Sequence, residues 1–166
     1  MLLNSNKTKS FTYKNWQKIK KYKKSDVIVF YKKFINNYLY LNKKYLFNKE
    51  LSKKYISNKI RNIKKKKNYN LELIPIGIKD NINTRFLTTN YGLKTKKNFM
   101  VGNNANIVDK IINNGGIIFS KTNCAEYAVH YMDEKFNRNP HNNNFIAGTS
   151  STGSAIAVSC GALPVT

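Results

Sequence analysis

The sequence predicts an α/β fold, and three stretches in its second half carry that prediction. Residues 71–78 form a short apolar run, which is typical of a buried strand. Residues 105–114 place apolar side chains at helical spacing and are followed by two glycines that end the helix. Residues 117–119 form a second short apolar run. Two buried strands separated by a helix usually pair in parallel, so we expect residues 71–78 and 117–120 to be neighbours in a parallel sheet covered by helices.

The order of elements along the chain divides it into three parts. Residues 1–12 are polar and are predicted to be disordered. Residues 13–70 are predicted to form basic amphipathic helices, because apolar and aromatic positions recur there at three- and four-residue spacing. Residues 71–166 hold the predicted strands. Within this last part we also expect helices over residues 125–131 and 155–160, and a loop over residues 137–144.

The formal net charge of +22 raises the question of nucleic-acid binding. Residues 1–70 carry 21 Lys and Arg against Asp26 and Glu50. However, only Arg61, Arg85 and Arg138 of the 30 basic residues are Arg, the side chain that best binds phosphate. Lysine, asparagine, isoleucine and tyrosine are abundant and share A/T-rich codons, so codon bias explains the charge more simply. We therefore do not expect nucleic acid to be a direct ligand.

Other function classes find little support in the composition. Cys124 and Cys160 form no CxxC motif, and His130 and His141 have no second ligand at metal spacing, so no metal and no cofactor are expected. No apolar run approaches the length of a membrane span, and the basic N-terminus lacks the apolar region of a signal peptide. The sequence indicates a soluble, cytoplasmic protein without a membrane partner.

The strongest functional signal is a loop of glycine, serine and threonine at residues 148–154, directly before an apolar helix. Such a loop directs backbone N–H groups and hydroxyls toward an anion or a reacting carbonyl oxygen. It is no P-loop, because Ser154 stands where lysine is required, and no nucleophile elbow, because Thr152 stands where glycine is required. A serine activated by a lysine remains, and Lys79 is the candidate because it directly follows a predicted buried strand.

Four motifs occur in a recognisable order: IPIGIKDNIN at residues 74–83, KTN at 121–123, NP at 139–140 and GTSSTGSA at 148–155. Together they resemble the amidase signature family. The resemblance implies that the chain holds the first strands and helices of that family's mixed sheet. It also implies cleavage of carboxamide C–N bonds by a Ser–cis-Ser–Lys mechanism.

The resemblance carries roles to individual residues. Lys79 would be the base, and Ser150 the bridging serine joined to Thr149 by a cis peptide, with the two side chains within hydrogen-bond reach and Lys79 buried. The loop that supports the site comprises Gly148, Thr149, Ser151, Thr152 and Gly153. The family's nucleophile lies in a later segment resembling GTDTGGS, so no nucleophile is expected in this chain. We expect a truncated enzyme with negligible amidase activity alone, in which Ser159 packs in a helix and does not react.

Two functions within the family stay open: a stand-alone amidase acting on a small carboxamide, and the A subunit of a glutamyl-tRNA(Gln) amidotransferase, which has partner subunits. The residues Glu126–Tyr127 and His141 depart from the Asp-Glu-Phe block and NPW turn of the amidotransferase, which favours a general amidase. An A/T-biased genome would favour the amidotransferase. Outside catalysis, the alternatives are an inactive gene fragment and a basic module that binds RNA or another anion.

Five positions depart from glycines of the family pattern: Leu73, Phe86, Ser120, Thr149 and Thr152.

Overall fold

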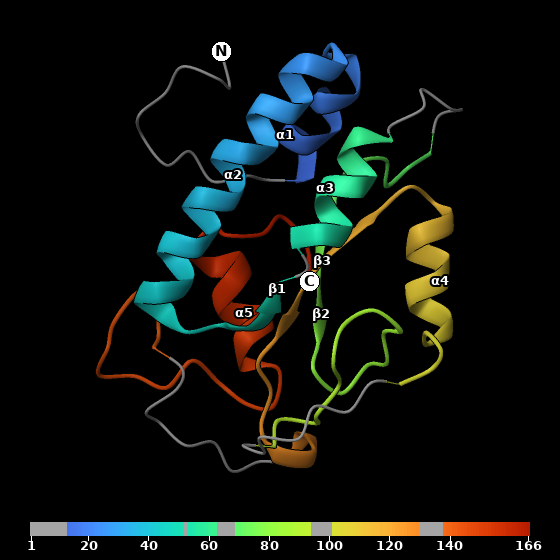
Figure 1. The fold of residues 1–166 in the computed structure, drawn as a ribbon. Coiled ribbons are helices and arrows are strands. Elements are labelled where there is room, and N and C mark those ends of the chain that lie inside the picture. The colour runs from blue at the N-terminus through green and yellow to red at the C-terminus, as the bar shows by residue number, and fades with distance from the viewer. Residues whose placement is uncertain (1–12, 52, 63–68, 94–100, 130–137) are drawn as a thin grey trace.

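The structure is a computed structural model that describes residues 13–51, 53–62, 69–93, 101–129 and 138–166 (Figure 1). The predicted disorder of residues 1–12 lies outside these ranges. Helices alternate with three short strands along the chain. In order, the elements are α1 (Tyr13–Gln17), the 3-10 helix η1 (Lys18–Lys21), α2 (Lys24–Tyr45), β1 (Asn48–Leu51), α3 (Lys53–Arg61), β2 (Pro75–Lys79), α4 (Asn106–Asn113), β3 (Ile117–Thr122), the 3-10 helix η2 (Glu126–Ala128) and α5 (Thr152–Ser159).

The strands form one mixed sheet in the order β1-β3-β2. β2 and β3 pair in parallel, with Pro75 opposite Ile117 and Lys79 opposite Thr122, and α4 lies in the connection between them. This confirms the predicted pair of buried parallel strands and its crossover helix. β1 adds an antiparallel strand on the other edge of β3. Val165 makes an isolated parallel bridge to Ile76, on the edge of β2 that β3 does not occupy.

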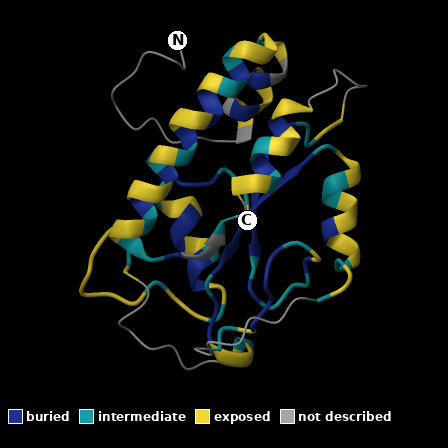
Figure 2. Ribbon diagram, viewed as in Figure 1, coloured by how far each residue is buried: buried dark blue, intermediate teal, exposed yellow. Residues whose placement is uncertain are grey.

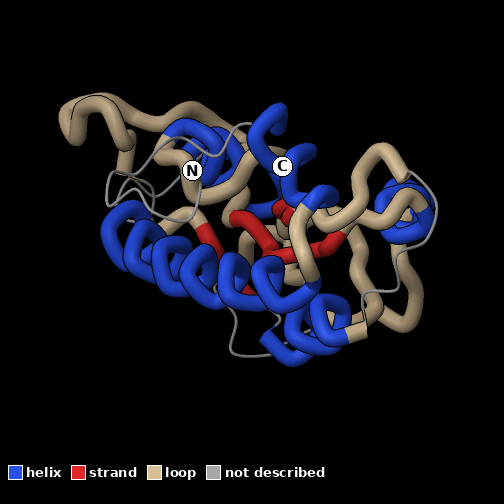
Figure 3. The backbone as a smooth tube through the Cα atoms, turned by 90° about the horizontal axis from the view of Figure 1, so that it is seen from above, coloured by secondary structure: helices blue, strands red, loops and turns tan. Residues whose placement is uncertain are grey.

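The helices surround this sheet. In the view of Figure 1 the long helix α2 lies on one side of the strands and α4 on the other. Seen from above, the strands lie behind α2, which runs alongside them (Figure 3). α5 contacts both β2 and β3, and α3 contacts β3. The central strands are therefore shielded from solvent, and every residue of β3 is buried (Figure 2).

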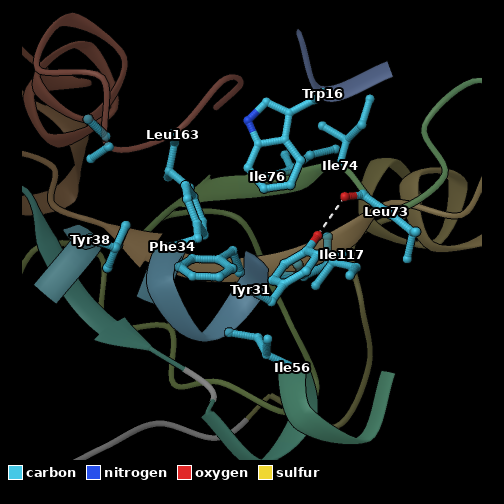
Figure 4. Close-up of a cluster of buried hydrophobic side chains, with 14 of the residues drawn as sticks. Trp16, Tyr31, Phe34, Tyr38, Ile56, Leu73, Ile74, Ile76, Ile117 and Leu163 are labelled. Atoms are coloured by element: carbon cyan, nitrogen blue, oxygen red, sulfur yellow. Dashed lines mark hydrogen bonds between the residues drawn. The ribbon is translucent and has the colours of Figure 1, made fainter. Parts of the chain in front are cut away.

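An aromatic cluster joins the N-terminal helices to the sheet. Trp16 packs edge-to-face on Phe30, Tyr31 and Phe34, with the Trp16 and Phe34 ring centroids 4.9 Å apart. Phe34 in turn contacts Phe119 of β3, at a centroid distance of 5.1 Å. The Tyr31 hydroxyl donates a hydrogen bond to the Leu73 carbonyl at 2.5 Å (Figure 4). The basic N-terminal helices and the strands thus share one hydrophobic core.

Several predicted boundaries were wrong. The strand predicted from residue 71 begins only at Pro75, as β2. Residues 71–73 form turns instead, and Ile74 connects them to the strand. α5 begins at Thr152, inside the predicted loop. The helix predicted over residues 125–131 is only the short η2, since the left-handed backbone of Tyr127 and Ala128, with φ of 51° and 59°, interrupts it; residues 130 and 131 lie outside the described residues. β1 was not predicted at all.

Two of the departures from family glycines have visible consequences. Leu73 adopts a left-handed backbone with φ of 61°, a conformation that glycine adopts most easily. Phe86 stacks on Tyr55 of α3, with ring centroids 4.2 Å apart and planes 13° from parallel.

Within the described ranges, no helix combines the length and the apolar character needed to cross a bilayer.

Candidate active site

The structure brings Lys79 and Ser150 together. Lys79 ends β2, and its Nζ donates a hydrogen bond to the Oγ of Ser150 over a distance of 2.8 Å. The two residues are 71 positions apart in sequence, so only the fold makes them neighbours. The predicted hydrogen bond is therefore confirmed. The predicted burial of Lys79 was wrong, because the side chain is only half-buried at the end of the strand.

The loop that carries Ser150 has a closely defined backbone. The peptide bond between Thr149 and Ser150 is cis, as the resemblance implied. The Ser150 carbonyl accepts a hydrogen bond from the Ala125 N–H at 3.1 Å. Gly148 adopts a left-handed backbone with φ of 86°, and the buried Thr152 donates its hydroxyl to the Gly148 carbonyl at 2.6 Å. Thr152 thus closes the loop with a hydrogen bond that glycine at this position could not donate.

Gly153 fixes the start of α5 against the end of β3. Its N–H donates to the Asn123 carbonyl at 3.0 Å, and the Asn123 N–H donates to the Phe47 carbonyl at 2.9 Å. A Cβ at Gly153 would lie only 2.4 Å from the Asn123 nitrogen and the Phe47 oxygen, so glycine is required here. The next residue, Ser154, shares a hydroxyl–hydroxyl hydrogen bond of 2.8 Å with Thr122. Two contacts therefore join the loop to the end of β3, one through the backbone of Asn123, directly after the strand, and one through the side chain of Thr122.

The remaining loop residues face solvent. Gly148, Thr149 and Ser151 are exposed, and Ser150 is half-buried. Lys79 and Ser150 themselves each keep part of their surface exposed. The expected packing of Ser159 was wrong, because the residue is exposed and its hydroxyl lies 2.7 Å from Nε2 of His141.

Two buried charged residues beside the pair were missed as candidates by the sequence analysis. Asp80, which follows Lys79 directly, and Lys121, in β3, are both fully buried. The motifs that contain them were recognised, but their positions were overlooked: Lys121 lies within the strand β3 and Asp80 directly follows β2. Charged side chains are seldom fully buried, so such positions are a signal in themselves. Across the residues that the structure describes, three or more His, Cys, Asp or Glu side chains nowhere gather into a metal-binding group.

A hydrogen-bonded lysine and serine can move a proton. A neutral lysine amine can accept the proton of a serine hydroxyl, and that serine can in turn accept a proton from a second hydroxyl. The same groups can later return a proton to a leaving amine. The arrangement fits general base chemistry on a bound carbonyl compound. Phosphate chemistry fits poorly, because Ser154 occupies the position of the P-loop lysine.

Curated proteins include relatives that are about 40% identical to part of this chain. The A subunit of glutamyl-tRNA(Gln) amidotransferase from Lactiplantibacillus plantarum is 41% identical over 96 residues, which covers 55% of this chain and 20% of that protein. The corresponding protein from Exiguobacterium sibiricum is 40% identical over 92 residues, covering 53% of this chain and 19% of the relative. The chain thus spans about one fifth of the length of these relatives.

Solved structures share the fold at low sequence identity. The urea amidolyase of Kluyveromyces lactis matches 95% of this chain with a TM-score of 0.78 at 18% identity, although the match covers only 10% of that enzyme. The peptide amidase PAM matches 92% of this chain, and 34% of its own, with a TM-score of 0.75 at 20% identity. The model of the family described as Amidase matches residues 35–166, most of the chain. The chain therefore belongs to the amidase family.

Proposed function

We propose that the protein carrying this chain cleaves carboxamide C–N bonds, with Lys79 as the base and Ser150 as the bridging serine. The observation that carries the proposal is the 2.8 Å hydrogen bond between Lys79 Nζ and Ser150 Oγ. Membership of the amidase family supports it. Part of the surface of Lys79 and of Ser150 is exposed, as contact with a small carboxamide requires.

In this mechanism the chain supplies the proton-transfer half of the site. Lys79 takes the proton of the Ser150 hydroxyl as Ser150 takes the proton of the attacking hydroxyl, and the protons return to the departing amine in reverse order. The family resemblance assigns the attacking hydroxyl to a segment resembling GTDTGGS, which residues 1–166 do not contain. Ser150 is therefore proposed as a relay and not as the nucleophile.

Glutamine is the proposed substrate. Eight curated relatives carry the name of the A subunit of glutamyl-tRNA(Gln) amidotransferase, an enzyme that needs ammonia for its amide product. On this proposal the chain works with partner subunits that use the ammonia. A stand-alone amidase is the second candidate, because Glu126–Tyr127 and His141 depart from the Asp-Glu-Phe block and NPW turn that are usual in the amidotransferase.

Ammonia release decides between these possibilities. The protein carrying this chain is incubated with glutamine or with simple carboxamides, as wild type and as Ser150→Ala, Lys79→Met and Ser159→Ala. Removing a general base or its relay typically costs about 10²–10⁴-fold in rate. We expect losses of that size in the first two variants and none in Ser159→Ala, which is a matched serine on the neighbouring helix.

Each outcome has a distinct meaning. Turnover that survives both Ser150→Ala and Lys79→Met contradicts the mechanism. Preference for glutamine supports the amidotransferase, whereas preference for simple carboxamides supports the stand-alone amidase.

A further inference from the structure

Lys121 is a buried lysine that the mechanism does not use. It lies in β3 opposite Ile78, with none of its surface exposed. Its Nζ donates hydrogen bonds to the Ile82 carbonyl and, at 3.0 Å, to the Thr89 hydroxyl. The Thr89 hydroxyl also lies 3.4 Å from the Ile82 carbonyl, to which it donates. One ammonium group therefore holds both ends of the loop between residues 82 and 89.

A tight turn connects Lys79 to the start of this loop. The Ile82 N–H donates to the Lys79 carbonyl at 3.0 Å, which closes a turn directly after Lys79. The same residue, Ile82, accepts the Lys121 hydrogen bond through its carbonyl. Lys121 thus holds the turn that fixes the direction in which the chain leaves β2, one hydrogen bond away from Lys79.

Asp80 holds the residues that directly follow this loop. Its carboxylate accepts hydrogen bonds from the N–H groups of Asn90, at 3.3 Å, and Gly92, at 3.0 Å. Its carbonyl accepts the Tyr91 N–H at 3.2 Å. Its own N–H donates to the Thr122 carbonyl at 3.0 Å, so the residue is anchored to β3.

From Asn90–Gly92 the contacts lead to Ser150. The Tyr127 N–H donates to the Tyr91 carbonyl at 2.7 Å. A Cβ at Gly92 would lie 2.5 Å from the carbonyl oxygens of Cys124 and Ala125, so the two backbones are in direct contact. Ala125 then donates its N–H to the Ser150 carbonyl at 3.1 Å. Asp80 is therefore linked to the Ser150 side of the pair, as Lys121 is to the Lys79 side.

We propose that Lys121 and Asp80 are positioning residues that together set the Lys79–Ser150 hydrogen bond. Burying a charge is costly unless its hydrogen bonds are satisfied, and apolar residues can often replace buried charges without loss of stability. A contribution to stability is therefore a poor explanation for the burial of these two charged side chains. Their hydrogen bonds lead instead to the turn beside Lys79 and to the backbone that holds Ser150. This inference rests on the proposed function, since that function gives the pair its importance.

The test uses lysine side chains labelled with ¹³C and follows the Lys79 Cε signal by NMR. The signal is identified by its loss in Lys79→Arg, and Ser150→Ala defines the shift caused by losing the hydroxyl partner. We expect Lys121→Met, Thr89→Val and Asp80→Asn to move the Lys79 signal in the same direction as Ser150→Ala. Lys110→Met, which removes an exposed lysine of α4, should leave it unchanged.

The outcomes separate this inference from the proposed function. If Ser150→Ala leaves the Lys79 signal unchanged, the pair itself is not formed and the proposed function fails. If Ser150→Ala moves the signal but folded Lys121→Met, Thr89→Val and Asp80→Asn do not, the positioning role alone is overturned. Should Lys121→Met fail to fold, Thr89→Val still decides, because it removes only one acceptor of the ammonium. In the active protein, we expect Thr89→Val to lower kcat about tenfold to a hundredfold with little change in KM.

Discussion

Replacing Gly153 by alanine tests how the loop is joined to the sheet. Gly153 lies in the first turn of α5, where the helix approaches the backbone of Asn123, directly after β3, and of Phe47, directly before β1. The added Cβ would lie 2.4 Å from the Asn123 nitrogen, 2.4 Å from the Phe47 oxygen and 2.7 Å from the Asn123 oxygen. All three are backbone atoms, so no side-chain rotation can relieve the contact.

The expected cost follows from these contacts. Forcing extra volume into a packed site costs about 1–3 kcal/mol. Moving the backbones apart also weakens two hydrogen bonds, from Gly153 to Asn123 and from Asn123 to Phe47, each contributing about 1 kcal/mol. We therefore expect Gly153→Ala to lower the free energy of unfolding by about 3–5 kcal/mol. For a chain of this size that corresponds to a fall in Tm of roughly 6–20 °C.

Thermal and urea unfolding followed by circular dichroism measure the effect. Gly102→Ala is the matched control, because a Cβ at Gly102 would meet nothing within 4 Å and its backbone is not left-handed. We expect the control to change stability by less than about 0.5 kcal/mol. If Gly153→Ala and Gly102→Ala unfold alike, the close approach of α5 to β3 is refuted, and with it the account of how Ser150 is held.

Two further predictions concern the core. Phe34→Ala should lower the free energy of unfolding by about 3–5 kcal/mol, because the Phe34 ring is 1% exposed and contacts both Trp16 and Phe119; a loss below about 1 kcal/mol in urea unfolding would contradict the packing. Burial raises the pKa of Tyr55 from 10.0 to about 12. The folded state therefore favours the neutral phenol, and the resulting contribution to stability is fully present below pH 10 and is lost as the pH rises through about 12. Titrating tyrosinate ultraviolet absorbance in wild type and Tyr55→Phe should reveal one phenol fewer ionising near pH 12 in the variant, and an unchanged curve would contradict the burial.

Apolar spacing predicted the elements whose own side chains determine their position. The helix at residues 105–114 was confirmed as α4 within one residue at each end, because its apolar face and the following glycines are local signals. The apolar run at 117–119 was confirmed as β3, which continues to Thr122. Lys79 and Ser150 were singled out from motifs whose residue types the proposed chemistry itself requires.

Elements determined by distant contacts were missed or misjudged. β1 has no apolar run, and its strand conformation follows from pairing with β3. Residues 125–131 have a helical pattern, yet the Tyr127 N–H donates to the Tyr91 carbonyl and the backbone turns left-handed instead. Thr152 and Gly153 favour loops by propensity, but the hydrogen bond from Gly153 to Asn123 places them in α5. In each case the deciding partner lies far away in the sequence.

The site itself depends on the same long-range contacts. Lys79 is placed by the parallel pairing of β2 with β3, and Ser150 by a hydrogen bond from the N–H of Ala125, just beyond β3. β3 is therefore the shared reference for both sides of the pair. Two of its buried polar side chains form hydrogen bonds toward the site, Lys121 to the Ile82 carbonyl and Thr122 to the Ser154 hydroxyl. A substitution in β3 should therefore disturb the Lys79–Ser150 pair more than an equally destabilising one in α2.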